Sequence, residues 1–441
     1  MGDRVPSKEA LTSGPARAGF PRLRLRNVSA SLLDLPWEQS LATWPATAYT
    51  FRDLPVGPSR HLVRFIVLDG RTFALKEEPR LVAEAEFEVL RRLEVAGLPA
   101  VTVVGLAAQT EGDEAILATE YLRYSIQYRR LLMRFPLGPG PYRDRLLDAM
   151  ASLLVDLHRG GVFWGDCSLA NTLFRRDGDK IQAYLVDAET SEIHPSLSDG
   201  QRSFDLDILV ENVGFGLADL GAMQGREDAF EDAVDAAESV RARYTGLWDE
   251  LNLEPELSAG DRHAIRARIR RLNDLGFAVD EINLEPTADG DTVRLRVAVA
   301  SRRFHAHELQ RLTGLVALEG QARLLLNDLR EYQAWLEHRS GTSISMEAAA
   351  ERWVGDVLEP SLATLAPAIG PRRDPLQAYC DVLEEKWLLS EAAGRDVGLE
   401  AAIAAYVELG APAPESGPAL ADSSIALDID WSGGFDLEDA G

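Results

Sequence analysis

The chain has 441 residues, of which 46% are hydrophobic and 27% charged, so it is long enough to form two or three domains. Its formal net charge of −25 disfavours general binding to nucleic acids or anionic membranes, because phosphates would be repelled over most of the surface. No apolar run reaches the length of a transmembrane helix and no signal region is visible, so we expect a cytoplasmic protein without a membrane span. Cys167 and Cys380 are too few for a disulfide framework or a zinc site.

The first predicted elements form a β-hairpin. His61–Leu68 and Thr72–Glu77 are its strands, and Asp69-Gly70 between them is typical of a two-residue hairpin turn. Alternation places Lys76 on the face opposite Leu75. Only four of the 46 basic residues are lysines, so the chain uses arginine wherever any cation will serve. Lys76 therefore indicates a task that needs a compact point charge.

A helix is predicted next over Leu81–Leu93, where apolar residues recur at helical spacing. The helix is rich in glutamates that could pair with Lys76. We choose Glu86 as the partner, with Glu84 and Glu88 as alternatives on the same acidic helix. Two apolar strands follow, over Ala100–Leu106 and Ala115–Tyr121.

A second, longer helix is predicted from Pro141 to about Leu157, with an apolar stripe that ends before two glycines. After it come Asp166 and Asn171, then two short strands around the turn Asp177-Gly178-Asp179, and then Asp187. Asn171 and Asp187 thus flank one hairpin, and we expect them to converge on one metal site. Their oxygen ligands suit Mg²⁺.

This order of residues fits phosphoryl transfer from ATP. That reaction needs a carboxylate to orient the acceptor hydroxyl, an amide oxygen for the metal, and a second carboxylate that joins metal to phosphates. Asp166 would be the catalytic carboxylate, and Asn171 and Asp187 would hold the metal. The alternative is that Asp166 and Asn171 only form and cap a turn.

The stretches Leu157–Asn171 and Ala183–Glu189 resemble the protein-kinase-like superfamily, more narrowly its bacterial lipopolysaccharide-kinase-like branch, which is grouped with the aminoglycoside and choline kinases. The resemblance covers roughly residues 45–220. Trp164-Gly165-Asp166 stands in place of His-Arg-Asp, so switching by loop phosphorylation is not expected. Asp187-Ala188-Glu189 stands in place of Asp-Phe-Gly. Ser168 replaces a lysine of many protein kinases, which favours a small-molecule acceptor over a protein.

The resemblance implies a bilobal α+β fold with ATP and Mg²⁺ as ligands. Lys76, held by Glu86, would contact the α- and β-phosphates. Backbone groups of the hinge, near Glu120 and Leu122, would meet adenine. Leu54–Arg60 takes the place of the glycine-rich phosphate loop but has a single glycine.

Three polar residues near the catalytic segment are interpreted as structural. His158 is expected to form hydrogen bonds at the end of the long helix. The resemblance implies that Asp205 or Asp207 holds the catalytic-loop backbone, although both could instead be helix-start carboxylates.

The C-terminal part is predicted to be mostly helical and resembles an uncharacterised domain that accompanies such kinase-like modules. We expect a hairpin over Phe277–Ala300 and helices at about 305–315, 319–339, 346–365, 374–390 and 398–408. Three tryptophans are interpreted as core residues: Trp335, Trp353 and Trp387. His305 and His307 are expected at the surface or at a helix start. Arg262, Arg266 and Arg270 share one helix face, most simply a solvated one.

These observations predict five segments and two candidate functions. The segments are an N-terminal extension, partly disordered (1–44), a small lobe (45–122), a large lobe (123–250), a mostly helical accessory domain with a β-hairpin (251–410) and a disordered acidic tail (411–441). The first function is an ATP- and Mg²⁺-dependent phosphotransferase acting on a hydroxyl of a small molecule or sugar-containing acceptor. The alternative is a nucleotide-binding pseudokinase that regulates or scaffolds a protein partner through its helical domain.

Overall fold

A computed structural model covers the chain and describes residues 22–26, 30–54, 60–108, 113–128, 130–131, 138–226, 229–258, 261–287, 292–299, 302–371 and 373–412. The chain divides into two compact units, Met1–Val354 and Gly355–Gly441. Most of the predicted phosphate loop and nearly all of the acidic tail lie outside the described residues.

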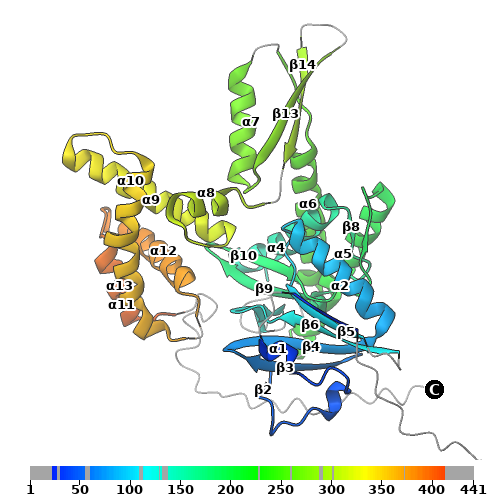
Figure 1. Cartoon of the computed structure of the whole chain (residues 1–441). Helices are drawn as coiled ribbons and strands as arrows, with labels where there is room; N and C mark the ends of the chain where they lie inside the picture. Colours follow the sequence, from blue (N-terminus) through cyan, green and yellow to red (C-terminus); the bar gives the residue numbers. More distant parts are fainter. Residues whose placement is uncertain are drawn as a thin grey trace, which may run out of the picture. The chain divides into compact units, whose positions relative to one another are not determined.

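The small lobe is built on one antiparallel sheet (Figure 1). Its strands are β1 (Arg22–Leu25), β2 (Phe51–Arg52), β3 (Leu62–Leu68), β4 (Arg71–Pro79), β5 (Val103–Ala108) and β6 (Glu114–Glu120), in the order β1-β5-β6-β4-β3-β2. Between β3 and β4, Asp69 and Gly70 have φ of 50° and 74°, the left-handed values that a type I′ turn requires. The predicted hairpin is confirmed.

One face of this sheet is covered by α2 (Arg80–Val95), the predicted helix. Its apolar residues Ala83, Phe87 and Leu90 are buried together with Val103 of β5. These residues recur every three or four positions, so a single stripe of the helix meets the sheet. Glu86 is buried on the same side of the helix.

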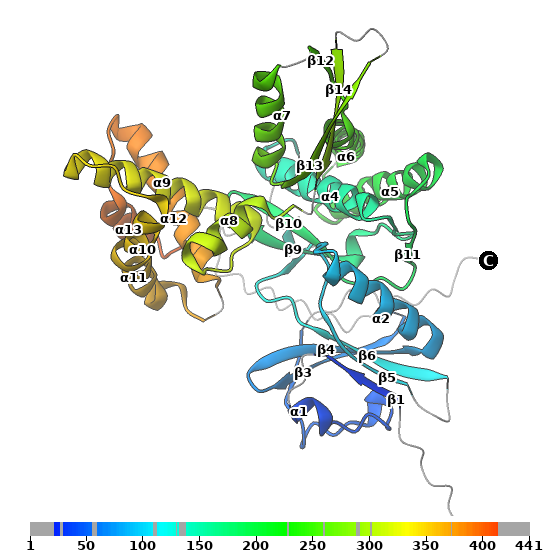
Figure 2. The same cartoon turned by 45° about the horizontal axis from the view of Figure 1, so that its top comes forward.

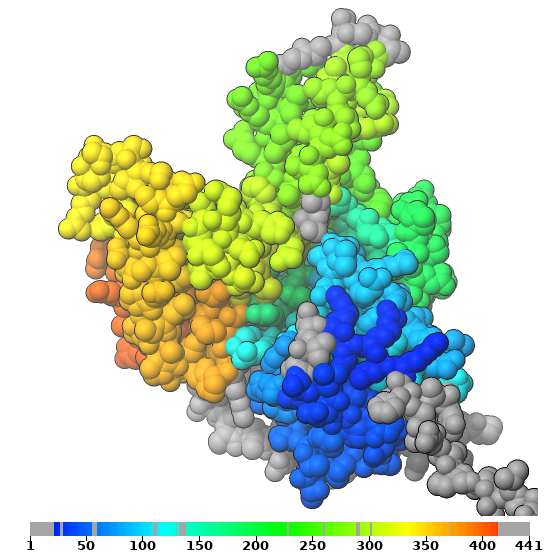
Figure 3. Space-filling view, in the orientation of Figure 1, coloured from blue at the N-terminus to red at the C-terminus, as the bar shows by residue number. Residues whose placement is uncertain are grey.

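The opposite face is covered by residues that precede β2, including α1 (Ala30–Leu33) and the 3₁₀ turn Leu41–Thr43. Trp37 and Trp44 are each 2% exposed and pack with apolar residues of the sheet. Figure 3 shows this part of the chain in dark blue on the surface of the small lobe. Residues 22–26 and 30–44 therefore contribute to the small lobe, whereas the sequence predicted an N-terminal extension there. Two isolated tryptophans give no periodic signal, so their burial becomes visible only in the fold.

The large lobe contains three long helices, which lie together in Figure 2. They are α4 (Pro141–Arg159), α5 (Asp199–Met223) and α6 (Ala229–Asn252). The strands are β7 (Ile126–Gln127), β9 (Thr172–Asp177) and β10 (Lys180–Leu185), in the order β10-β9-β7, and the pair β8 (Val162–Phe163) and β11 (Glu192–Ile193). The predicted α4 and the β9–β10 hairpin are confirmed. Asp205 lies inside α5, whose N-cap is Ser198, so it is no helix-start residue.

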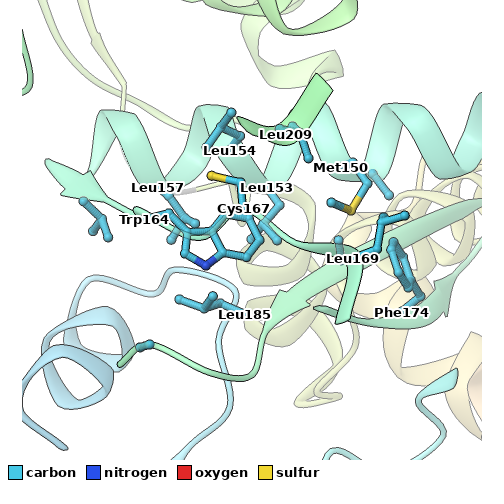
Figure 4. Packing of buried hydrophobic residues seen from close by; sticks show 14 of the residues in the cluster. Met150, Leu153, Leu154, Leu157, Trp164, Cys167, Leu169, Phe174, Leu185 and Leu209 are labelled. Carbon is cyan, nitrogen blue, oxygen red and sulfur yellow. The ribbon is translucent and has the colours of Figure 1, made fainter. Parts of the chain in front are cut away.

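The segment 164–171, which carries the predicted catalytic residue Asp166, packs on the core of this lobe. Figure 4 shows Trp164 and Cys167 among leucines of α4, including Leu153 and Leu157. Both side chains are fully buried. Burial raises the pKa of the Cys167 thiol, which therefore stays protonated and acts as a packing residue.

The rest of the first unit follows α6. Its elements are β12 (Glu256–Ser258), α7 (Arg262–Asp274), β13 (Val279–Pro286), β14 (Thr292–Val299), α8 (Phe304–Thr313), α9 (Glu319–Ser340) and α10 (Met346–Trp353). The strands pair in the order β12-β14-β13, and α7 contacts β13. Arg262, Arg266 and Arg270 are exposed on α7, as predicted. The strands β13 and β14 confirm the hairpin predicted over Phe277–Ala300, and residues 288–291 between them lie outside the described residues.

The second unit contains α11 (Glu359–Ile369), α12 (Pro375–Ala393) and α13 (Leu399–Glu408). The helix predicted over 346–365 is present as one continuous helical run, but a π-helical turn, Val354–Leu358, lies within it between α10 and α11. Pro360 follows this turn, and because proline has no N–H it cannot bond the carbonyl four residues earlier. Within the described residues, no helix combines the length and the apolar character needed to cross a membrane.

Four aromatic or histidine predictions can be compared with the structure. Trp353 is buried as predicted, and its indole N–H donates to Asp328 Oδ2 at 2.8 Å. Trp335 and Trp387 are 49% and 62% exposed, so their assignment to the core is wrong. His305 is the second residue of α8, so the helix-start alternative holds, and it is buried with its Nδ1 2.7 Å from Glu319 Oε1. In each case the tertiary partner, not the residue type, sets the burial.

Candidate functional site

Lys76 lies at the centre of a cluster of carboxylates. Strand β4 directs it away from the core that contains Leu75. Its Nζ lies 3.0 Å from Glu86 Oε2, 2.8 Å from Glu78 Oε2 and 3.1 Å from Asp187 Oδ1. Burial alone would lower the pKa of Lys76, but Glu86, Asp187 and Glu78 together raise it above its ordinary value. The ammonium is therefore charged.

Of the three glutamates considered for Lys76 on α2, the geometry selects Glu86. It is 1% exposed, and its second oxygen accepts the Ala188 N–H at 3.1 Å, so it joins Lys76 to the segment that carries Asp187. Burial raises the pKa of Glu86 to about 8, with Asp187 adding to the effect. Glu84 and Glu88 pair instead with arginines outside the cluster.

Two further carboxylates were missed as partners of Lys76. Glu78 is fully buried, and Glu189 Oε2 lies 3.5 Å from Nζ and 3.2 Å from His61 Nε2. One atom each of His61, Glu78 and Glu189 lies within 4.8 Å of the others, close enough to share a cation. The signal for Glu78 was present, because residues two apart on a strand point to the same face. No sequence pattern links Glu189 to His61.

The catalytic segment brings Asp166 and Asn171 together. A 3₁₀ turn, Leu169–Asn171, begins after Ser168, whose hydroxyl accepts the Asn171 N–H at 3.2 Å. This turn directs the Asn171 side chain back, so that its Nδ2 donates to Asp166 Oδ2 at 3.0 Å. The two residues thus do form a capped turn, and the same turn aligns both side chains. Asp166 is half-buried.

Asp205 is the residue that holds the catalytic-loop backbone. Its carboxylate accepts the N–H groups of Trp164 at 2.7 Å and Gly165 at 2.8 Å, and it lies 3.1 Å from His158 Nε2. The other nitrogen of His158 lies 2.7 Å from the Tyr244 hydroxyl, as expected for a structural histidine. Asp207, the alternative, forms an exposed ion pair.

Gly165 occupies a position that no larger residue fits. Its φ is +80°, and a Cβ there would lie 2.9 Å from the Thr190 carbonyl oxygen. The arginine of typical protein kinases is therefore excluded by the backbone itself. This gives a physical reason for the departure seen in the sequence.

A cavity of about 280 Å³ is lined by the predicted site residues other than Asp166, which is joined to it through its hydrogen bond with Asn171. Its polar part contains Lys76, Glu86, Asn171 and Asp187. Its apolar lining comes from both lobes: Leu54, Val63, Phe65, Ala74, Val101, Leu117, Ile126, Leu173 and Val186. Its size and lining are those of a small-molecule site, in which apolar walls enclose a few polar groups.

The hinge residues line the same cavity, although several of their backbone groups already have partners. The N–H of Glu120 donates to Thr102 at 2.8 Å, and the carbonyl of Leu122 accepts from the Ser125 hydroxyl at 2.7 Å. The Glu120 side chain pairs with Arg71, 2.7 Å away. The Glu120 carbonyl and the Leu122 N–H are the groups that fit the predicted contacts with a base.

The region that carries this geometry matches a known protein family. Residues 71–222 match the lipopolysaccharide kinase (Kdo/WaaP) family. The chain thus contains a Kdo/WaaP-family domain. Residues 246–409 match a domain of unknown function, DUF4032, so the resemblance seen in the sequence is confirmed for both parts.

Solved structures and curated proteins add little detail. The chain is similar to WaaP in complex with acyl carrier protein, with 22% identity, covering 51% of this chain and 94% of that chain at a TM-score of 0.34. It is also similar to an aminoglycoside-3'-phosphotransferase of type VIII, with 15% identity, covering 47% and 89% at a TM-score of 0.33. No curated protein matches. The Kdo/WaaP-family domain and its two-lobed α+β architecture support a kinase-like phosphotransferase.

Proposed function

We propose that the chain is an ATP- and Mg²⁺-dependent phosphotransferase that acts on a hydroxyl of a small molecule or sugar-containing acceptor. The observation that carries the proposal is the convergence of Lys76, Asn171 and Asp187 on one cavity, with Asp166 hydrogen-bonded to Asn171. These residues come from distant segments of the chain. A turn-forming role would explain the pair Asp166 and Asn171 but not this convergence.

The chain's own groups fit a nucleotide. The apolar walls of the cavity would receive the base, and the Leu122 N–H and Glu120 carbonyl would bind its edge. Lys76, kept charged by its neighbouring carboxylates, would bind the α- and β-phosphates. Glu86 restricts Lys76 to one orientation, so less side-chain entropy is lost when ATP binds.

The donor set fits Mg²⁺. Because the Asn171 amide nitrogen donates to Asp166, its Oδ1 is directed elsewhere, and Asp187 uses Oδ1 for Lys76, which leaves Oδ2. Two oxygens of residues that line the cavity match the hard-ligand preference of Mg²⁺. Mg²⁺ held by Asn171 and Asp187 would supply neutralisation of charge on the phosphates.

Asp166 would orient the acceptor hydroxyl and take its proton. Its carboxylate is aligned by Asn171, and the preceding backbone is held by Asp205. Such alignment matters because phosphoryl transfer depends mainly on positioning and charge stabilisation.

The test measures ADP formation by the full chain with ATP, Mg²⁺ and a panel of sugars and amino alcohols. Asp166→Asn should lower turnover by about 10²- to 10⁴-fold, the usual effect of losing a positioned acid or base, while ATP still raises the melting temperature. Lys76→Ala should abolish that thermal shift. Lys386→Ala, in the other unit, is the matched lysine control and should retain it.

The pseudokinase remains the second candidate because of one observation. Glu189 stands beside both Lys76 and His61, where its carboxylate would compete with phosphates for Lys76. If the chain binds ATP but forms no ADP with any acceptor, and if Asp166→Asn changes neither result, the chain is this pseudokinase. Its helical region would then bind a protein partner. A cytoplasmic location stays part of either proposal.

A further inference from the structure

A second cavity, of about 420 Å³, lies within the first unit and shares no lining residue with the first. The Kdo/WaaP-family domain contributes Gly97–Ala100, the end of α4, and Gln182 and Tyr184 of β10. The DUF4032 region contributes Phe277, Val299, Arg302, Arg303 and Ala317–Glu319. The cavity is therefore a joint product of the two matched regions, and it lies in the volume range typical of small-molecule sites.

Of the residues that the structure describes, two buried acids line this cavity: Asp177, whose Oδ1 accepts the Gln321 N–H, and Asp156. Asp156 lies in the last turn of α4 and is 6% exposed. Among the described residues, its carboxylate forms no side-chain hydrogen bond and no ion pair within the 4.0 Å limit. Burial raises the pKa of Asp156, and the positive charges of Arg302 and Arg159 oppose this effect. A buried carboxylate without a partner is costly, so a site that retains one indicates a missing cation or donor.

Arg302, from the DUF4032 region, is one of the three described arginines that line the cavity, with Arg159 and Arg303. Its Nη2 donates to the neutral Gln182 Oε1 at 3.0 Å, and within the part of the chain that the structure describes it forms no ion pair. Arg159, by contrast, donates to the Val299 carbonyl at 3.1 Å and lies over the Phe277 ring. The cavity is also lined by Glu94, Asp177 and Glu319, each of which has a hydrogen-bonded partner, and by the exposed Arg303. Asp156 and Arg302 line the same cavity without forming an ion pair with each other.

We infer that this cavity binds a small zwitterion with an apolar body, such as an amino acid with an aromatic or aliphatic side chain. Its amine would pair with Asp156, and its carboxylate would pair with Arg302. Leu98, Pro99 and Phe277 offer apolar surface for the body. A ligand that carries both charges satisfies both residues, whereas a simple cation or anion satisfies one and leaves the other unpaired.

The cavity also touches the elements that build the nucleotide site. Pro99 and Val101 form backbone hydrogen bonds with Leu185, both at 3.0 Å, and Asp187 follows two residues later. Glu94, another lining residue, belongs to α2, the helix that carries Glu86. A bound zwitterion would therefore change ATP affinity, a consequence that rests on the proposed function.

The test is calorimetric titration of the full chain, without nucleotide, with three probes: L-phenylalanine, phenethylamine, which lacks the carboxylate, and 3-phenylpropionate, which lacks the amine. L-Phenylalanine should bind at least about tenfold more tightly than either analogue, because each analogue leaves one buried charge unpaired. Asp156→Asn should reduce L-phenylalanine to the affinity of 3-phenylpropionate. Arg302→Gln should reduce it to that of phenethylamine. Asp148→Asn, an exposed aspartate on the same helix, is the control and should change nothing.

Absence of saturable L-phenylalanine binding to the wild type, or equal binding of all three probes, would overturn the inference. So would evidence that Arg302 rotates onto Asp156 instead. In that case each single variant lowers the melting temperature, and the double variant lowers it no further than either one. The titration contains no ATP, so its result does not depend on whether the proposed phosphotransferase function is correct. Binding that leaves ATP affinity unchanged refutes only the coupling.

Discussion

The Lys76 ammonium contacts more carboxylates than it can neutralise. Glu78, Glu86, Asp187 and Glu189 all lie within 3.5 Å of Nζ. Like charges held this close disfavour each other's ionised form, which is why burial and Asp187 together raise the pKa of Glu86. The cluster therefore favours additional positive charge, which supports the proposed binding of Mg²⁺ beside it.

Glu86→Gln should weaken ATP binding by roughly 10- to 100-fold, the range expected when a charge-assisted hydrogen bond is lost. The amide can still accept the Ala188 N–H, so the fold should be retained. Glu84→Gln, on the same helix but paired with Arg80, should leave ATP affinity unchanged. Titration of ATP with Mg²⁺ into each variant measures the difference, and equal affinities for both variants would refute the role of Glu86.

His158 predicts a pH dependence of stability. Burial lowers its pKa, Asp205 raises it by hydrogen bonding and charge, and Arg202 lowers it further, with a net decrease. Because the folded pKa lies below the unfolded value of about 6.5, the unfolded chain takes up the proton first. The stability that His158 contributes is therefore present above about pH 6.5 and is lost as pH falls towards the folded pKa.

His158→Gln should lower the free energy of unfolding at neutral pH, since the contacts with Tyr244 and Asp205 change. The free energy of unfolding should also fall less steeply below about pH 6.5 in this variant. The slope should change by at most about 1.4 kcal/mol per pH unit, which is the limit for one proton. Urea unfolding of both proteins at several pH values measures the two slopes. Exposed His307 provides the control, and parallel slopes for wild type and His158→Gln would contradict the assignment.

At the scale of elements, the N-terminus of α9 lies directly on the turn between β9 and β10. Asp177 Oδ1 accepts the Gln321 N–H at 2.8 Å, and Arg323 pairs with Asp179 at 2.7 Å. The carboxylate thus caps a helix of the DUF4032 region, where the helix dipole favours negative charge. The two backbones are so close that a Cβ at Gly320 would lie 2.2 Å from the Asp177 carbonyl oxygen.

Gly320→Ala and Gly246→Ala should therefore have opposite effects, although both replace a glycine within a helix. Gly320→Ala should destabilise the chain by about 1–3 kcal/mol, because the methyl group meets backbone that cannot move aside easily. Gly246 has open space around it, so alanine there should stabilise α6 by roughly 0.5–1 kcal/mol. Denaturant unfolding measures both. The same sign for both changes would mean that α9 does not pack on the turn as described.

At the scale of the whole molecule, the net charge of −25 outweighs the local arginine face of α7. Several of the arginines nearby already pair with acids, including Arg294 with Glu256 and Arg296 with Glu254. Long-range repulsion acts over the Debye length, about 8 Å at physiological salt and about 30 Å at 0.01 M.

The chain should therefore not bind a random-sequence DNA duplex at about 0.15 M salt, and low salt should not rescue binding. Fluorescence anisotropy of a labelled duplex measures this. A variant with glutamine at positions 262, 266 and 270 should behave like wild type. A Kd below about 10 µM at that salt, weakened in the variant, would show that the arginine face acts as a binding surface despite the net charge.

Local chemistry in the sequence was sufficient for several features of the fold and site. The β3–β4 hairpin follows from Asp69-Gly70, because few residues adopt left-handed backbone readily. The spacing of Asp166 and Asn171 is set by one turn, so their pairing at 3.0 Å could be anticipated. The long helix before them was visible from its apolar stripe alone.

Where several residues of one type fitted the same sequence pattern, only the tertiary structure showed which of them makes the contact. Glu86 rather than Glu84 or Glu88 meets Lys76, because packing of α2 on the sheet buries one face of the helix. Packing likewise selected Asp205 over Asp207. Periodicity defines the faces of a helix, but which face is buried depends on partners far away in the sequence. The second cavity has the same origin, since Asp156 and Arg302 belong to different matched regions and line one cavity only in the folded chain.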